Sequence, residues 1–198
     1  MARDMGPVLK RCRSLGIEPA YLGIDKKSNR AVQRSRRKPS EYSLQLREKQ
    51  KAKFIYGVLE KPFRNLFNRA QAMKTGTAGE NLLSLLELRL DNVMFRMGFA
   101  RTRAEARQIV SHKHVLVNGK CVNIPSYTLK VGDKIEIKEK HKNTIRYKDI
   151  FEVTEGRTVP EWLEVNHEDH SGVVKEIPTR DQIDVPVDEV LIVELYSK

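Results

Sequence analysis

Apolar residues recur at helical spacing in the middle of the chain, in a leucine-rich segment that runs to Gly98. This spacing places five of them on one face of a helix: Leu86, Leu90, Val93, Met94 and Met97. Arg89 and Arg96, seven residues apart, would share another face. Because glycine tolerates the left-handed conformation that ends many helices, the pattern predicts one amphipathic helix ending at Gly98.

A second, more basic helix is predicted to begin after Thr102. Thr102 is a typical N-cap residue, and Glu105, three positions later, completes a capping box. Arg103 and Arg107 are four residues apart, so we expect them to project from one side of this helix as a pair of cations. The apolar residues expected to pack it on a core are Ala106, Ile109 and Val110.

Strands are predicted after these helices. Asn118-Gly119 separates two short β-prone runs and favours a hairpin with a type I′ turn. Two further strands are expected at 127–130 and 134–138, reversed at Gly132. Another hairpin is expected from 162–165 and 173–177.

The rest of the chain contains helical patterns and one β-prone run. Ser40 is a plausible N-cap for a helix reaching Lys53, and Pro62 suits the first turn of another helix. Residues 143–153 form a weaker helical pattern. The apolar run 185–195 is β-prone.

The charge is large and unevenly distributed. The 198 residues include 37 Lys and Arg against 26 Asp and Glu, a net charge of +11. Residues 1–146 carry 32 basic and 13 acidic side chains, whereas 147–198 carry 5 and 13. This division favours an RNA-facing body with an acidic end that meets a protein. From charge alone, the central arginines could equally be the solvated face of an ordinary helix pair.

Motifs for catalysis, metals and membranes are missing from the sequence. It lacks Gly-x-Ser-x-Gly, His-Glu-x-x-His and Cys-x-x-Cys motifs, and 75–79 lacks the Lys-Ser/Thr ending of a P-loop. Cys12 and Cys121 are too few for a structural zinc site, and we expect His167 and His170 to be solvated loop residues. No cofactor, small-molecule substrate or membrane association is therefore expected, and without a secretory leader the chain is expected to be cytoplasmic.

Several motifs point to one family. The central region contains LRLDN at 88–92, TRAEAR at 102–107 and HVLVNG at 114–119. These resemble the RNA-binding module shared by ribosomal small-subunit protein four, some pseudouridine synthases and bacterial tyrosyl-tRNA synthetases. The flanks, among them SEY at 40–42 and FRNLF at 63–67, resemble only the ribosomal family, in its zinc-free bacterial form. An RNA-modifying enzyme would need a catalytic domain, for which the residues after 140 are too few.

The resemblance implies an α+β fold. A helical N-terminal domain, residues 1–85 completed by 178–198, would hold an inserted RNA-binding domain, residues 86–177. In the core module of the insertion, residues 86–140, two helices would pack on a small, mainly antiparallel sheet. The C-terminal run would return to pack on the N-terminal helices.

The resemblance also implies a function and partners. The chain would be a structural constituent of the small ribosomal subunit, binding a junction in the 5′ domain of its rRNA and nucleating assembly. Decoding fidelity, repression of its own messenger RNA and contact with neighbouring ribosomal protein five are further implied roles. Arg36, Arg37 and Lys38 would lie where messenger RNA enters the subunit, although the basic run 33–38 could also be a disordered tail.

The expected RNA contacts are basic side chains in both parts of the chain. In the central module they are Arg89, Arg96, Arg101, Arg103, Arg107, Lys113, His114 and Lys120. In the N-terminal part they are Arg3, Lys10, Arg11, Arg13, Arg36, Arg37, Lys38, Arg47, Lys49, Lys51, Lys53, Arg64 and Arg69.

Overall fold

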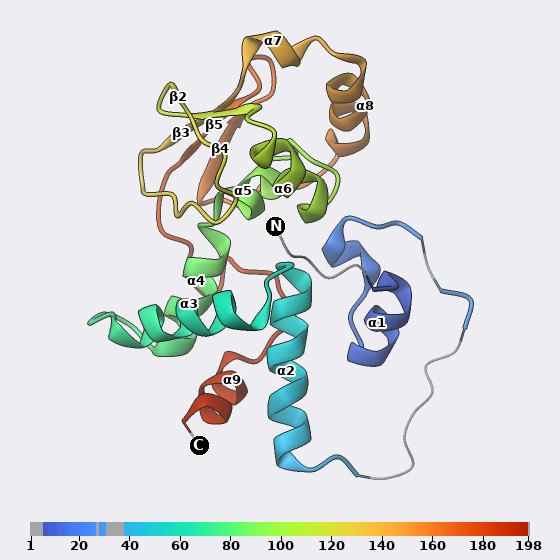
Figure 1. Cartoon of the computed structure of the whole chain (residues 1–198), viewed down its shortest axis with the longest axis vertical. Helices are drawn as coiled ribbons and strands as arrows, with labels where there is room; N and C mark the ends of the chain where they lie inside the picture. Colours follow the sequence, from blue (N-terminus) through green and yellow to red (C-terminus); the bar gives the residue numbers. More distant parts are fainter. Residues whose placement is uncertain (1–5, 27, 31–37, 198) are drawn as a thin grey trace. The chain divides into compact units, whose positions relative to one another are not determined.

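The computed structural model describes residues 6–26, 28–30 and 38–197, and the chain divides into two compact units (Figure 1). Unit 1 comprises residues up to Leu83 together with Asp184–Lys198, and unit 2 is Ser84–Ile183. Unit 1 is helical and unit 2 combines helices with an antiparallel sheet, so the predicted α+β class is confirmed. The sequence predicted domain boundaries at residues 85 and 178, and these boundaries stay a prediction.

Unit 1 is built from helices, of which the first and the last pack on the long helix α2. Their bounds are α1 Val8–Leu15, the 3₁₀ helix η1 Pro19–Leu22, α2 Glu41–Ile55, α3 Glu60–Ala72, α4 Ala78–Glu87, which continues into unit 2, and α9 Glu189–Tyr196. The predicted start of α2 is confirmed, since Ser40 Oγ accepts a hydrogen bond from the Ser43 N–H at 3.3 Å. The sequence analysis missed a capping box at α4, where Thr77 Oγ1 accepts from the Glu80 N–H and Glu80 Oε2 accepts from the Thr77 N–H.

The C-terminal segment forms a helix, so the prediction of a β-prone run at 185–195 is wrong. Asp188 Oδ1 accepts from the Val190 N–H at 3.0 Å and caps α9. The expected return to the N-terminal helices is confirmed: the Tyr196 ring stacks on Phe67 with centroids 4.6 Å apart, and Gln45 Nε2 of α2 donates to Glu194 Oε2 at 2.9 Å. These packing contacts override the β propensity of the valines and isoleucine.

Unit 2 consists of two short helices, a sheet and a further helical segment. Their bounds are α5 Leu90–Arg96, α6 Arg103–Ser111, β1 Val115–Val117, β2 Lys120–Cys121, β3 Lys134–Ile137, α7 Glu139–Lys142, α8 Ile145–Thr154, β4 Leu163–Asn166 and β5 Ser171–Val174. Within the described ranges the strands pair antiparallel in the order β2-β1-β3-β5-β4. α5, α6 and α8 share one hydrophobic core with this sheet, around Trp162 and Tyr147, each 1% exposed.

Both predicted hairpins are confirmed. Asn118 and Gly119 have φ values of 50° and 75°, as a type I′ turn requires, and they join paired strands β1 and β2. β4 and β5 pair from Leu163↔Val174 to Asn166↔Ser171. The predicted strand at 127–130 is wrong, because only Thr128 forms a β-bridge there.

The leucine-rich segment contains two helices, so the prediction of one continuous helix to Gly98 is wrong. Arg89 is extended (φ −71°, ψ 137°) and bridges Thr128, which separates α4 from α5. The Leu129 N–H donates to Leu88 O at 2.9 Å, so a distant segment supplies the backbone partner that a continuous helix would have supplied. The predicted helix end is confirmed, since Gly98 has φ 79°. Among the helices described, none combines the length and apolar character needed to span a bilayer.

Candidate nucleic-acid interface

Unit 2 contains a buried ion pair at the start of α5. Arg89 and Asp91 are each 3% exposed. The Arg89 guanidinium donates from Nε to Asp91 Oδ1 at 3.0 Å and from Nη2 to Oδ2 at 2.6 Å. Arg107 of α6 reaches the same carboxylate at 3.4 Å. The bidentate pairing satisfies charges that burial would otherwise make costly, and the contact from Arg107 links α6 to α5.

A second buried carboxylate, Glu87, joins α4 to α5. Glu87 is fully buried, and its carboxylate accepts from Asn92 Nδ2 at 2.6 Å. Arg96 donates to both of its oxygens, at 3.1 and 2.8 Å. Arg96 therefore neutralises a buried acid, which is a structural task.

Arg103 and Arg157 complete this polar interior. Arg103 is 7% exposed; its Nε donates to Asn92 Oδ1 at 2.7 Å, and its guanidinium lies over the Phe95 ring. Arg157 also lies over that ring and donates to the carbonyl oxygens of Phe95, Ala100 and Arg101. These bonds satisfy carbonyl groups around the end of α5.

The expected geometry of the arginine pairs is therefore wrong. Arg103 is buried and does not project beside Arg107, and Arg89 lies before α5 and not on one helix face with Arg96. A buried guanidinium held by internal acceptors is not positioned to contact a ligand. The polar residues between 87 and 92 lie within a nearly continuous apolar run, which was the signal that their charges would be internal.

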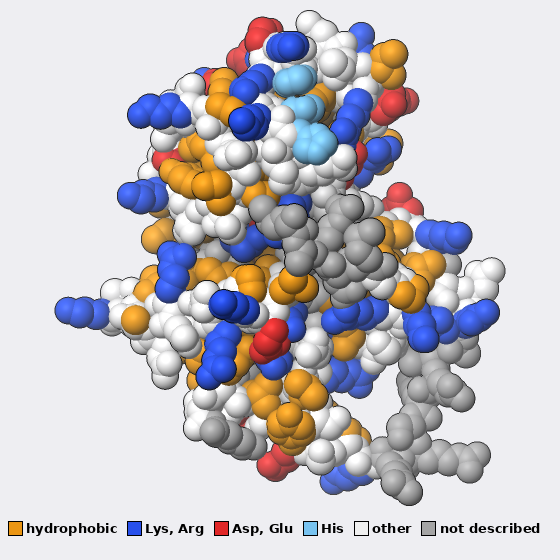
Figure 2. All heavy atoms as spheres, viewed as in Figure 1, with side chains coloured by type: hydrophobic (Ala, Val, Ile, Leu, Met, Phe, Trp, Pro, Cys, Tyr) orange, Lys and Arg blue, Asp and Glu red, His pale blue; other side chains and the backbone are white. Residues whose placement is uncertain are grey.

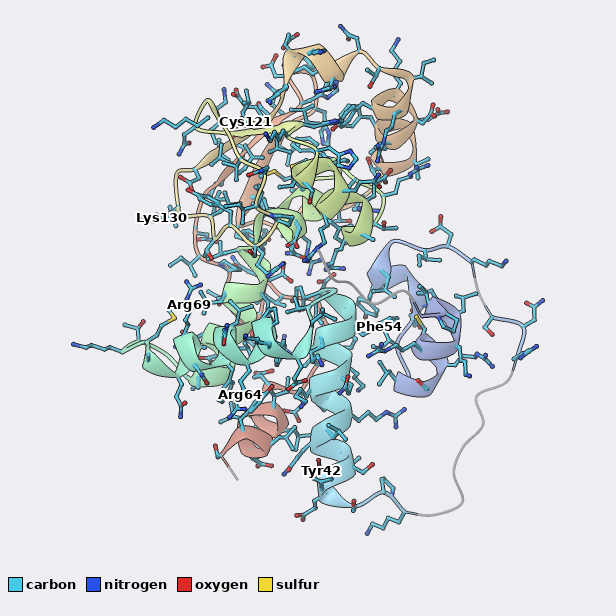
Figure 3. All side chains as sticks on the ribbon, viewed as in Figure 1. Tyr42, Phe54, Arg64, Arg69, Cys121 and Lys130 are labelled. Atoms are coloured by element: carbon cyan, nitrogen blue, oxygen red, sulfur yellow. The ribbon has the colours of Figure 1, made fainter. Side chains whose placement is uncertain are left out.

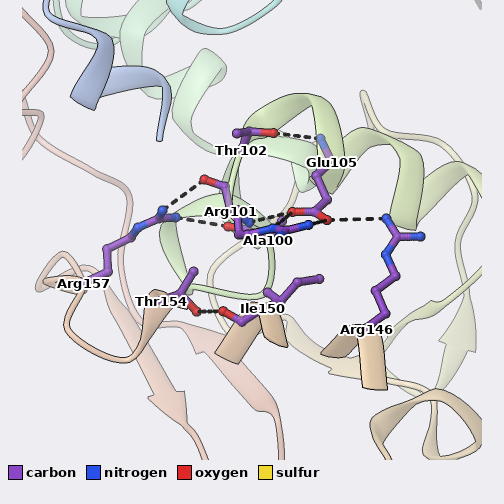
Figure 4. A network of polar contacts seen from close by, with 8 residues as sticks. All are labelled: Ala100, Arg101, Thr102, Glu105, Arg146, Ile150, Thr154 and Arg157. Atoms are coloured by element: carbon purple, nitrogen blue, oxygen red, sulfur yellow. Dashed lines mark hydrogen bonds and ion pairs between the residues drawn. The ribbon is translucent and has the colours of Figure 1, made fainter. Parts of the chain in front are cut away.

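Near the start of α6 the side chains of Arg101 and Arg146 are 47% and 40% exposed, and both contact Glu105 (Figure 4). Thr102 Oγ1 accepts from the Glu105 N–H, as the sequence predicted, whereas the Glu105 carboxylate accepts from Arg101 and not from Thr102. Burial raises the pKa of Glu105, but hydrogen bonds from Arg101 outweigh this and lower it. Arg146 of α8 lies 3.6 Å from the same carboxylate. The exposed Arg101 is thus held in a fixed orientation.

Two exposed lysines lie at the β1–β2 hairpin, one before β1 and one at the start of β2. Lys113 and Lys120 were both expected from the sequence, and both are exposed. Lys113 has φ 63°, which turns the chain from α6 into β1. Exposed lysines that the sequence analysis did not select include Lys130, labelled in Figure 3, and Lys134. Both lie outside the motifs that carry the family resemblance.

In unit 1, α3 presents two exposed arginines that were expected from the sequence. Its Phe63, Leu66, Phe67 and Ala70 face the core, while Arg64 and Arg69 are exposed (Figure 3). Several cations of α2 have partners instead. Lys49 and Lys53 both bind Glu60, at 3.0 and 2.6 Å, and Lys51 binds Glu48 at 2.6 Å.

The expected contact residues therefore fall into four groups. Exposed are Lys10, Lys38, Arg47, Arg64, Arg69, Arg101, Lys113 and Lys120. Partly exposed are Arg11, Arg13, Lys49, Lys51, Lys53, Arg96, Arg107 and His114. Buried are Arg89 and Arg103, and outside the described residues lie Arg3, Arg36 and Arg37.

The histidines of the β4–β5 loop differ from each other. His167 is exposed, as expected, but the His170 ring stacks on Phe151 with centroids 3.9 Å apart, so the prediction of a solvated side chain is wrong for His170. Burial lowers the pKa of His170. In the described ranges no three His, Cys, Asp or Glu side chains are grouped as metal ligands. The exposed functional groups are therefore mainly guanidinium and ammonium groups, which are suited to binding phosphates.

Comparison with known proteins agrees with this chemistry. A family model described as "Ribosomal protein S4/S9 N-terminal domain" matches residues 3–87, and one described as "S4 domain" matches 88–135. The chain is 77% identical to small ribosomal subunit protein uS4 of Lachnoclostridium phytofermentans over 198 residues, which cover all of both chains. Proteins of the same name from Agathobacter rectalis and Fusobacterium nucleatum are 70% and 51% identical, also over the full length of each chain.

Proposed function

The chain belongs to the S4 family of small-subunit ribosomal proteins, and from this premise we propose that it nucleates assembly by binding a multi-helix junction in the 5′ domain of the rRNA. Members of this family are structural components of the ribosome, so the expectation of a non-enzymatic, cytoplasmic RNA-binding protein agrees with the family. The observation that carries the proposal is that some cations, such as Arg64 and Arg69, are exposed, whereas others, such as Arg89 and Arg96, are bound to internal carboxylates.

The exposed cations are the proposed phosphate contacts. Arg64 and Arg69 in unit 1 and Arg101, Lys113 and Lys120 in unit 2 have side chains open to solvent. Phosphate contacts provide affinity without sequence preference, so selection of the junction comes from RNA shape matched to a rigid protein surface. Arg89, Arg96 and Arg103 support this by holding α4, α5 and α6 together.

Four finer roles rest on the family and on charge. Contact with neighbouring ribosomal protein five is supported by the acidic segment 147–198, whose 13 Asp and Glu outnumber 5 Lys and Arg. A role in decoding fidelity follows from the family alone. A position near the point where messenger RNA enters the subunit would involve Arg36 and Arg37, which lie outside the described residues, and Lys38, which is exposed. Repression of its own messenger RNA would use the same cationic surface.

A filter-binding titration tests the proposal. The full chain is titrated against a transcript of the rRNA 5′ domain and against a 3′-domain transcript of equal length. We expect at least tenfold tighter binding to the 5′ domain, since electrostatics alone would treat both transcripts alike. Equal affinity for the two transcripts would refute junction recognition.

A further inference from the structure

Three imidazole rings gather on the surface of unit 2, and we call His112, His114 and His141 the histidine stack. The His114 and His141 rings are parallel, with centroids 3.8 Å apart and an interplanar angle of 7°. His112 meets His114 edge-on at 6.2 Å and 66°. Figure 2 shows imidazole side chains gathered on one face, near the top of the view, among Lys and Arg side chains.

The histidine stack is assembled from two segments of the chain, the connection between α6 and β1 and the helix α7, and one of its rings contacts the core. His112 follows α6 as its C-cap, His114 immediately precedes β1, and His141 belongs to α7. His114 Nδ1 lies 3.2 Å from Tyr147 Oη, and Tyr147 is 1% exposed. The position of the His114 ring is therefore fixed by the core, while His112 is exposed and His141 partly exposed.

The central ring of the histidine stack, His114, is uncharged near neutral pH. Burial, followed by the proximity of His141 and Arg146, lowers the pKa of His114 from 6.5 to about 4. A neutral ring stacks without repelling its neighbour, so His114 contributes an aromatic surface and not a further cation. Positive charge is supplied separately by Lys138 and Arg146, although Arg146 also lies near Glu105.

An unpaired nucleotide matches the combination of stacked aromatic rings and nearby cations. Proteins recognise single-stranded RNA by stacking bases on aromatic side chains, histidine included, while nearby cations bind the flanking phosphates. A phosphate alone would need the cations but not the parallel rings. We infer that the histidine stack is a platform for one unpaired base of the bound RNA, with Lys138 and Arg146 facing its phosphates. This inference rests on the proposed rRNA binding.

Substitutions at His141 separate stacking from charge. We expect His141→Ala to weaken binding of the full chain to the 5′-domain transcript, roughly 5- to 100-fold. His141→Phe keeps an aromatic face and should bind within about threefold of wild type, whereas His141→Lys supplies a cation but no ring and should bind as poorly as His141→Ala. His167→Ala, in the exposed β4–β5 loop, is the matched control and should bind as wild type. Urea denaturation of each variant reports whether the fold is intact.

A second readout does not require rRNA affinity. A single-stranded oligouridylate carrying one 2-aminopurine should lose fluorescence on binding the wild-type chain and His141→Phe, but not His141→Ala. Absence of quenching with the wild-type chain, tight rRNA binding by His141→Lys with weak binding by His141→Phe, or equal binding by all variants would each overturn the platform. A chain that quenches 2-aminopurine but does not bind the 5′-domain transcript would instead refute the proposed function and leave the platform standing.

Discussion

The guanidinium of Arg103 lies over the ring of Phe95, 4.2 Å from its centroid, in the interior of unit 2. A basic residue of the most family-like motif thus has a structural task. In the proposed function the RNA phosphates are bound by other, exposed cations.

Substitution of Arg103 should lower the stability of the fold and should not remove a direct RNA contact. Arg103→Ala leaves the buried Asn92 Oδ1 without its charged donor, and we expect the free energy of unfolding to fall by about 2 kcal/mol. Urea denaturation measures this loss. Gln108→Ala, an exposed neighbour on α6, is the control and should change stability by less than about 0.5 kcal/mol. Unchanged stability together with weakened RNA binding would show that Arg103 is a contact after all.

Removing Asp91 should be more damaging. Asp91→Ala leaves the Arg89 guanidinium buried and without its bidentate partner, and we expect a loss of about 3 kcal/mol in the free energy of unfolding. Asp149→Ala removes an exposed carboxylate from α8 and serves as the matched control. A similar, small effect of both substitutions would contradict the assignment of Arg89 to the interior.

The contacts of Glu60 predict that the stability of unit 1 depends on pH. Burial raises the pKa of Glu60, but hydrogen bonds from Lys53, Lys49 and Tyr196 outweigh it and lower the pKa from 4.5 to about 2. The folded chain thus favours the carboxylate, so this contribution to stability is complete above pH 4.5 and is lost as the pH falls towards 2.

Glu60→Gln tests this dependence. The variant should be less stable than wild type at pH 6, and the difference should shrink between pH 4.5 and 2 when unfolding is measured by urea titration at each pH. Glu161→Gln, at an exposed position, should show no such convergence. A difference that is independent of pH would mean that the Glu60 charge does not stabilise the fold.

Local signals in the sequence predicted much of the fold. Ser40, Thr102 and the Asn118-Gly119 turn act through neighbouring backbone groups, and all three are confirmed. The break at Arg89 was missed because its backbone partner, Thr128, lies far along the chain. The helix at 189–196 was missed because its packing on α2 outweighs β propensity.

The sequence predicted that the candidate site is positively charged, but not which of its cations are exposed. Exposed Lys113 and Lys120 followed from composition and motif, but the burial of Arg103 depends on Asn92 and Phe95, which belong to another helix. The histidine stack combines residues 112, 114 and 141, and no spacing rule relates them. Tertiary structure decides which cations are available, and charge counting does not.

The exposed arginines of α3 should contribute directly to RNA binding. Arg64→Ala and Arg69→Ala should each weaken binding to the 5′-domain transcript and reduce the salt slope by about 1, because each removes one phosphate contact. Stability should stay within about 0.5 kcal/mol of wild type. Asn68→Ala, an exposed neutral position on the same helix, is the control. Wild-type affinity and slope in both arginine variants would exclude α3 from the interface.

The dependence of RNA affinity on salt tests the central claim, an exposed cationic surface that binds RNA phosphates, most directly. If six to ten exposed cations contact phosphates, affinity for the 5′-domain transcript should fall by roughly 10³- to 10⁵-fold between 50 and 200 mM salt, or by less where the contacted strand is single. Affinity that stays constant over this range would contradict the account.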